Sequence, residues 1–279
     1  MALSRYISRI LDFDFHIMSV VRVLGSRAAG KTTYLTALAS FAKKQANFSV
    51  TPINDEAKKL ANWAENILEQ GGRLTPTDAE KSPNELPSYL FLIEGKQRFQ
   101  KQRIDLSIRD YSGEIFEKMA QDSILDQKTQ SHINSCLNKD ITGCLIMLTA
   151  WEKSEDNKYR KALDYFTRTM EIRKRDQNLR LALVMGKCER GEIWPGRIEP
   201  ETDLFDLYLP STKKLLEARI PSKNLGFFAV SAFGVLGKND PRPNRIDEYG
   251  KEGTHAVLRD PELWQPYNLL APIFWAGRL

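Results

Sequence analysis

Cysteine and histidine are scarce in this sequence, which contains three of each in 279 residues. Cys136, Cys144 and Cys188 lack the close spacing of zinc ligands, and three thiols are too few for a disulfide framework. We therefore expect neither a zinc site nor disulfide bonds, as is typical of proteins from a reducing compartment.

The sequence also lacks long hydrophobic runs. No apolar stretch approaches the length that spans a bilayer, and the first residues lack the apolar core and cleavage site of a signal peptide. These absences predict a cytoplasmic protein with no transmembrane segment. Residues 3–15 mix apolar and basic side chains, which fits either an element packed on its own domain or an amphipathic helix on a partner or a peripheral membrane surface.

Clustered charge of one sign is a third absence. The formal net charge is +5, but Lys and Arg are scattered among Asp and Glu along the chain. Binding to a phosphate backbone usually needs a clustered basic face. We therefore expect no nucleic acid partner.

Short apolar segments bounded by polar or glycine-containing sequence are typical of β-strands. Six are present, at residues 19–24, 88–93, 104–110, 143–150, 180–186 and 225–231. Four of these are almost continuously apolar, which favours central parallel strands. The second and third are joined by too few residues for a crossover helix, which predicts an antiparallel hairpin with one strand at a sheet edge. The predicted fold class is α/β, with a mixed, mainly parallel six-stranded sheet and helices on both faces.

Helical patterns fill the intervals, at residues 32–44, 55–70, 114–125, 155–175 and 211–219. Residues 190–210 predict an ordered loop, and the polar, Pro- and Gly-rich residues 237–262 predict an insert or surface loop. Apolar residues near the end predict a closing helix within 263–279. Because no domain boundary is evident, we expect a single domain over 1–279, with residues 1–18 as an N-terminal extension.

One motif carries chemistry. The pattern G-x-x-x-x-G-K-[ST] occurs once, directly after the first predicted strand and before a helical pattern. Its glycines let the backbone wrap phosphate oxygens, while its lysine reaches the β- and γ-phosphates and its threonine hydroxyl binds Mg²⁺. The predicted nucleotide-binding residues here are Gly25, Ser26, Arg27, Ala28, Ala29, Gly30, Lys31, Thr32 and Thr33.

Three further elements follow in the order that a nucleotide site needs. Asp110 ends a predicted strand, where a carboxylate can hold magnesium, and Gly113 can offer a backbone N–H to the γ-phosphate. Ligands of open α/β sheets gather at the carboxyl ends of strands. The residues expected to border the base, after two later strands, are therefore Lys187, Glu189, Ser231 and Ala232.

With these four elements in this order, the chain resembles the Ras-like, translation-factor-related small GTPases over nearly its whole length. Residues 71–78, 110–114 and 272–275 also resemble the bacterial double-GTPase branch. The resemblance implies a P-loop fold of the Ras-like G-domain type, Mg²⁺ and GTP or GDP as cofactors, and a protein effector or regulator as partner. It further implies a switch threonine on magnesium, for which Thr77 is preferred to Thr75.

The chain departs from this family in the base-reading loop. The family has Asn-Lys-x-Asp, whereas this chain has Gly186 in place of Asn and Glu189 in place of Asp. A glutamate can still accept hydrogen bonds from guanine, and Lys187 can cover the base with its stem. The choice between guanine and adenine is therefore open.

Hydrolysis rests on fewer residues. Glu114 stands where many relatives have a water-orienting glutamine, so it either orients water, with Lys31 and Thr77 as further catalytic residues, or simply begins a helix. Arg27 either contacts phosphate or a partner, or is exposed. The predicted function is an Mg²⁺-dependent guanine-nucleotide-binding protein that hydrolyses GTP and acts as a molecular switch. The alternatives are an interaction module with little turnover and an ATP-binding protein.

Overall fold

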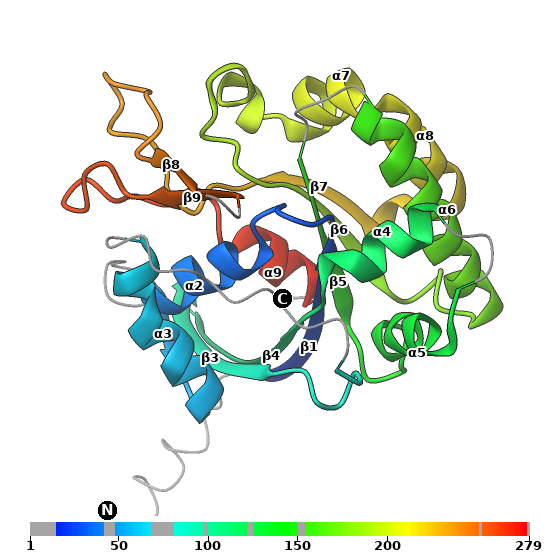
Figure 1. Cartoon of the computed structure of the whole chain (residues 1–279). Coiled ribbons are helices and arrows are strands. Elements are labelled where there is room, and N and C mark those ends of the chain that lie inside the picture. Colours follow the sequence, from blue (N-terminus) through cyan, green and yellow to red (C-terminus); the bar gives the residue numbers. More distant parts are fainter. Residues whose placement is uncertain are drawn as a thin grey trace, which may run out of the picture.

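A seven-stranded sheet forms the centre of the structure, a computed structural model that describes residues 15–41, 48–68, 81–97, 100–121, 125–149, 154–250 and 253–277 (Figure 1). The strand order is β2-β3-β4-β1-β5-β6-β7. Their bounds are β1 (Phe15–Gly25), β2 (Phe48–Pro52), β3 (Ser88–Gln97), β4 (Gln100–Asp110), β5 (Gly143–Leu148), β6 (Arg180–Met185) and β7 (Leu225–Ala229).

Strand directions confirm a mixed, mainly parallel sheet. β1 pairs in parallel with β4 and β5, and β6 is parallel to both β5 and β7. The predicted hairpin is confirmed as the antiparallel pair β3–β4. The prediction of six strands was wrong, because β2 adds a seventh that pairs antiparallel with β3. β2, and not a strand of the hairpin, therefore lies at that edge.

The helices on this framework confirm the five helical patterns, with ends that differ by a few residues. They are α2 (Lys31–Phe41), α3 (Asp55–Leu68), α4 (Gly113–Gln121), α6 (Ser154–Ile172) and α8 (Pro210–Arg219). A further helix, α5 (Gln127–Cys136), was not predicted because its sequence is mostly polar; Asp126 caps it by accepting a hydrogen bond from Thr129 N at 2.7 Å. The predicted loop at 190–210 contains short helical turns that end in α7 (Asp206–Tyr208).

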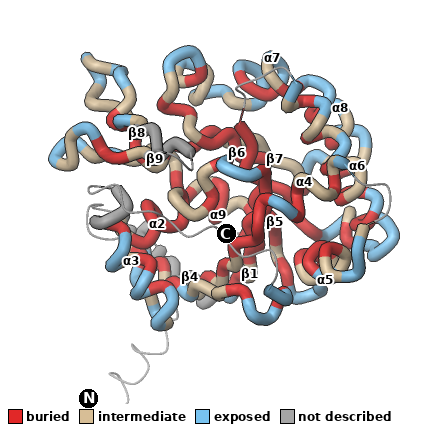
Figure 2. Tube along the Cα trace, viewed as in Figure 1, coloured by how far each residue is buried: buried red, intermediate tan, exposed pale blue. Residues whose placement is uncertain are grey.

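The sheet separates two apolar cores, and successive side chains along a strand point alternately into one core and the other. In β6, Leu181, Leu183 and Met185 join one core, with residues of α4, α5, α6 and α8. Ala182 and Val184 join the other, with residues of α2, α3 and α9 (Ala271–Ala276). Buried residues accordingly run through the middle of the molecule in Figure 2. The central strands are apolar throughout because helices cover both faces of the sheet.

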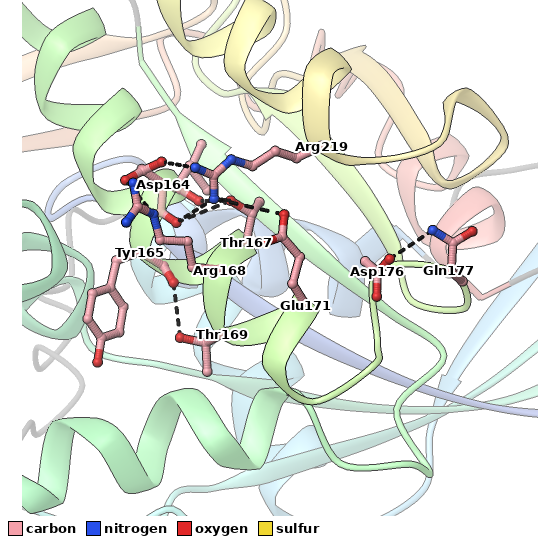
Figure 3. Close-up of polar contacts among 10 residues, drawn as sticks. Asp164, Tyr165, Thr167, Arg168, Thr169, Glu171, Asp176, Gln177 and Arg219 are labelled. Atoms are coloured by element: carbon pink, nitrogen blue, oxygen red, sulfur yellow. Dashed lines mark hydrogen bonds and ion pairs between the residues drawn. The ribbon is translucent and has the colours of Figure 1, made fainter.

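Polar contacts join α6 to α8. Arg219 of α8 donates to Asp164 Oδ1 of α6 at 2.5 Å, and Arg168 pairs with Asp164 Oδ2 at 3.1 Å (Figure 3). At the other end of α8, Asp156 accepts hydrogen bonds from Ser211 N and Thr212 N, each at 2.9 Å. A carboxylate from α6 thereby caps the N-terminus of α8.

The last part of the chain returns to the sheet. Strands β8 (Ile246–Gly250) and β9 (Gly253–Val257) form a separate antiparallel hairpin within the predicted insert, which projects at one side of the domain in Figure 1. Within the described part of the predicted closing segment, the helix is α9, which is shorter than the segment. Next to it, Ser19 Oγ of β1 donates to Gly277 O at 3.0 Å. Residues 1–14, Thr75 and Thr77 lie outside the described residues. Within the described part of the chain, none of the helices has the length and hydrophobicity needed to span a bilayer.

Candidate nucleotide-binding site

The predicted phosphate loop connects the end of β1 to the start of α2. Its glycines lie where the backbone has positive φ angles. Gly25 has φ +141°, Ala28 has φ +60° and Gly30 has φ +91°. A Cβ on Gly25 would lie 2.0 Å from the carbonyl oxygen of Met147 in β5, so a side chain cannot fit there. Left-handed backbone at these positions turns the chain tightly between strand and helix.

Lys31 is held inside this loop and is only 7% exposed. Its ammonium donates to the carbonyl oxygens of Gly25 at 3.1 Å and Ser26 at 3.0 Å. Burial lowers its pKa, while the nearby charges of Asp110 and Glu117 act in the opposite direction. The loop thus surrounds a partly desolvated cation, which suits an anionic ligand.

Thr32 and Asp110, two predicted magnesium ligands, meet in the structure. Thr32 Oγ1 donates to Asp110 Oδ2 at 2.9 Å, and the carboxylate is 1% exposed at the end of β4. Parallel pairing of β1 with β4 places Asp110 opposite Val23, two residues before the phosphate loop begins. A hydroxyl beside a carboxylate fits Mg²⁺, which takes few protein oxygens and completes its shell with water and phosphate. The described residues hold no group of three or more His, Cys, Asp or Glu that could bind a metal without such help.

Gly113 brings the start of α4 against the phosphate loop. A Cβ on Gly113 would lie 2.5 Å from the Cα of Arg27, so only glycine permits this approach. Ser112 Oγ accepts from Glu114 N at 3.3 Å, and the Glu114 side chain is exposed in the first turn of α4. That position suits the helix dipole. Arg27 is exposed as well.

Lys187 connects the phosphate loop to the loop predicted to border the base, residues 186–190, which we call the base loop. It adopts φ +58°, and its Cε would lie 3.7 Å from a Cβ built on Gly30. Burial, together with the nearby cations Arg245 and Arg190, lowers its pKa to about 8. The stem of Lys187 therefore lies beside the phosphate loop.

Gly186 stands where the resemblance to Ras-like GTPases predicts asparagine, and its surroundings leave no room for a side chain. A Cβ here would lie 2.8 Å from the carbonyl oxygen of Ala29 in the phosphate loop. Gly186 N donates to Leu148 O at 2.9 Å, which continues the β5–β6 pairing. The two loops thus meet through their backbones, in a space that a side chain would need.

Contacts that the sequence did not predict hold Glu189 and the second loop expected to border the base, at Ser231 and Ala232. Glu189 is 1% exposed, and its Oε1 accepts from Arg245 Nη1 at 2.9 Å. Ser231 Oγ accepts from Gly234 N at 2.6 Å, and the carbonyl of Ala232 accepts from Trp264 Nε1 at 2.8 Å. Arg245 belongs to the polar insert and Trp264 follows it, and no local pattern at either position signals a role beside these loops.

A second missed feature ties the phosphate loop to α6. The hydroxyl of Tyr159, a fully buried residue, lies 3.2 Å from Ser26 Oγ and 3.0 Å from Thr149 Oγ1. It also donates to Glu155 Oε1 at 3.0 Å. A tyrosine on the apolar face of a helix is typical of a core residue, so the sequence gives no signal for this hydrogen-bond network. Thr33, the last predicted residue of the site, lies partly exposed in α2.

The predicted site residues that the structure describes come from four places in the sequence, and part of them meet at the phosphate loop. Lys31, Thr32 and Asp110 meet at the phosphate loop, with Gly113 against it and Lys187 beside it. Glu189, Ser231 and Ala232 face other protein groups, as described above. Thr77 is the one predicted site residue outside the described ranges.

Comparisons with known proteins give one family match. The family model for Double-GTPase 1 matches residues 22–182, which is more than half of the chain and ends before Lys187. A search of curated proteins finds no match.

Solved structures give distant similarities. The Arl6 BBS3 small GTPase from Trypanosoma brucei with bound GppNp has a TM-score of 0.39 and 11% identity, over 77% of this chain and 87% of that one. The signal recognition particle receptor SRb-GTP/SRX complex from Chaetomium thermophilum has a TM-score of 0.38 and 12% identity, over 77% and 91%. The S. cerevisiae Ski7 GTPase-like domain bound to GTP has a TM-score of 0.38 and 15% identity, over 89% of this chain and 49% of that one.

Proposed function

Because this chain belongs to the Double-GTPase 1 family and contains its GTP-binding domain, we propose that it binds Mg²⁺ and a guanine nucleotide, hydrolyses GTP and acts as a molecular switch. The observation that carries the proposal is the meeting of Lys31, Thr32 and Asp110 around one glycine-bounded loop. A buried ammonium and a hydroxyl at the start of α2, beside a carboxylate at the end of β4, are the groups that a metal-bound triphosphate requires.

Each of these residues has a distinct task in the proposed site. Backbone N–H groups of residues 25–32 at the N-terminus of α2 would donate to phosphate oxygens, and Lys31 would exchange its two carbonyl partners for them. Thr32 and Asp110 would hold Mg²⁺, which supplies charge neutralisation on the phosphates when bound. Gly113, against Arg27, is placed to add a backbone donor from α4.

The hydrolytic step needs a group that orients water. Glu114 is exposed at the start of α4, where its carboxylate can accept a hydrogen bond from water. Its negative charge would oppose that of the γ-phosphate, so we propose that turnover depends on a cation from a protein effector or regulator. Thr77 remains the proposed switch threonine.

A second candidate function is supported by the same glutamate. An interaction module that binds nucleotide with little turnover would tolerate an acidic residue in place of glutamine, and the exposed Glu114 fits that role. Measured phosphate release separates the two functions. Release that stays at the level of Lys31→Ala, with candidate partners present, would favour the module.

The proposed binding is tested by titrating the full chain with fluorescent GTP, GDP and ATP analogues, with and without Mg²⁺. We expect magnesium-dependent guanine binding that Lys31→Ala abolishes and that Lys223→Ala, at an exposed lysine far along the chain, leaves unchanged. Asp110→Asn should weaken the response to Mg²⁺ more than binding without the metal. Equal affinity for ATP would overturn the guanine assignment, and a lack of any nucleotide binding would overturn the proposal as a whole.

A further inference from the structure

A chain of alternating charges, buried at Glu189 and Arg245 and partly exposed at Asp247 and Arg190, joins the insert to the base loop. Arg245, directly before β8 and 7% exposed, donates Nη1 to Glu189 Oε1 at 2.9 Å and Nε to Asp247 Oδ1 at 2.9 Å. Asp247 Oδ2 in turn accepts from Arg190 Nη2 at 2.8 Å. Two residues of the insert thus hold two neighbouring residues of the base loop, at a separation of 56 residues for the Arg245–Glu189 pair.

The two oxygens of Glu189 have different surroundings. Oε1 is bonded to Arg245, whereas Oε2 is buried and has no hydrogen-bond partner among the described residues. A buried carboxylate oxygen without a donor is unfavourable, and such atoms are rare in native proteins. The missing partner of Oε2 is therefore a hydrogen-bond donor that the rest of the described chain does not supply.

Guanine offers the donors that this oxygen lacks. Its N1–H and 2-amino group lie side by side, whereas adenine presents an acceptor at N1. Lys187, two residues before Glu189, lies against Gly30 of the phosphate loop, so the base loop and the phosphate loop are in contact. A glutamate has one more rotatable bond than an aspartate, and fixing its carboxylate requires an additional contact.

We propose that Arg245 is a positioning residue for base selection. Its guanidinium fixes Oε1 of Glu189 and leaves Oε2 as the acceptor for the N–H groups of guanine, so the insert decides which base the site prefers. This inference rests on the proposed nucleotide binding. Asp247 completes the arrangement by accepting from Arg245 Nε, and Arg190 in turn donates to Asp247.

The test measures base preference, which a merely structural role would not change. GTP, ITP and ATP compete with a fluorescent GTP analogue for the wild type, Arg245→Ala and Arg242→Ala. ITP lacks the 2-amino group, and Arg242 is an exposed arginine of the same insert that pairs only locally with Asp240. We expect Arg245→Ala to lose about tenfold or more of the preference for GTP over ATP, and Arg242→Ala to keep it.

Two results would overturn the role of Arg245. One is an unchanged ratio of GTP to ATP affinity in folded Arg245→Ala, and the other is an equal loss for GTP, ITP and ATP. If Arg245→Ala does not fold, Arg245→Lys decides: one ammonium cannot hold Glu189 and Asp247 in the same geometry, so we expect a loss of at least about threefold in preference. Full preference in Arg245→Lys would then refute the proposal.

Failure of this inference and failure of the proposed function give different results. If the wild type binds no GTP, or Lys31→Ala binds it as tightly, the proposed function fails. If Lys31→Ala abolishes binding while the Arg245 variants keep the wild-type preference, only the role of Arg245 fails.

Discussion

Adding a side chain at Gly186 should weaken both folding and nucleotide binding. A Cβ there would lie 2.8 Å from the carbonyl oxygen of Ala29 and 3.4 Å from Met147 Cε. The Ala29 oxygen belongs to the main chain of the phosphate loop, so it cannot rotate away as a side chain would. Relief of the clash must therefore move one loop relative to the other.

The size of the effect follows from overpacking. Extra atoms in a well-packed interior cost about 1–3 kcal/mol of folding free energy. For a chain of this size that corresponds to a fall in Tm of about 2–12 °C. Gly186→Asn should be worse than Gly186→Ala because it adds more atoms against the same oxygen. Both should weaken GTP binding, since the substitution would displace Ala29 of the predicted phosphate loop.

Thermal unfolding and GTP titration test this reasoning, with Gly237→Ala as the matched control. A Cβ at Gly237 would have no neighbour within 4 Å, so the same chemical change should leave Tm and GTP affinity close to those of the wild type. The reasoning is refuted if Gly186→Ala melts and binds GTP like the wild type, or if Gly186→Asn binds GTP more tightly.

Three further predictions concern the groups around the site. Tyr159→Phe should cost about 0.5–1.5 kcal/mol in urea unfolding and weaken GTP binding, because the hydroxyl near Ser26 is lost; unchanged GTP affinity would show that this hydroxyl does not hold the loop. Asp156→Ala should cost about 0.5–2 kcal/mol through the lost α8 cap. Burial raises the pKa of Asp156, but hydrogen bonds from Thr212 and Ser211 outweigh it and leave the pKa lowered, so this contribution is present above about pH 4 and lost as the pH falls through the lowered value; a variant with the wild-type acid unfolding profile would contradict it. Because the pKa of Lys187 is about 8, about half of its amines are neutral at pH 8, and acetylation followed by mass spectrometry should find it more reactive than exposed lysines and protected by GTP; reactivity equal to that of Lys223 would contradict the lowered pKa.

The local patterns of the sequence were sufficient for most of the fold. Continuous apolar segments predicted the central strands, and helical patterns in the intervals between them predicted five helices, because neighbouring residues largely decide which face of an element is buried. The resemblance to the double-GTPase branch is confirmed by the match to residues 22–182. Strand β2 escaped prediction because five residues with a single fully buried valine, Val50, carry little pattern, and pairing with β3 makes them a strand.

The candidate site likewise has residues that the sequence predicted and contacts that only the structure shows. The glycines, Lys31 and Thr32 are contiguous, so their spacing alone predicted a phosphate loop, and Asp110 followed from the end of an apolar strand. The contact of Gly186 with Ala29, the hydrogen bond of Tyr159 to Ser26 and the pairing of Arg245 with Glu189 join residues far apart in the chain. Short motifs record what neighbouring residues do together, whereas contacts across such distances exist only once the sheet and its helices have packed, and only the tertiary structure decides them.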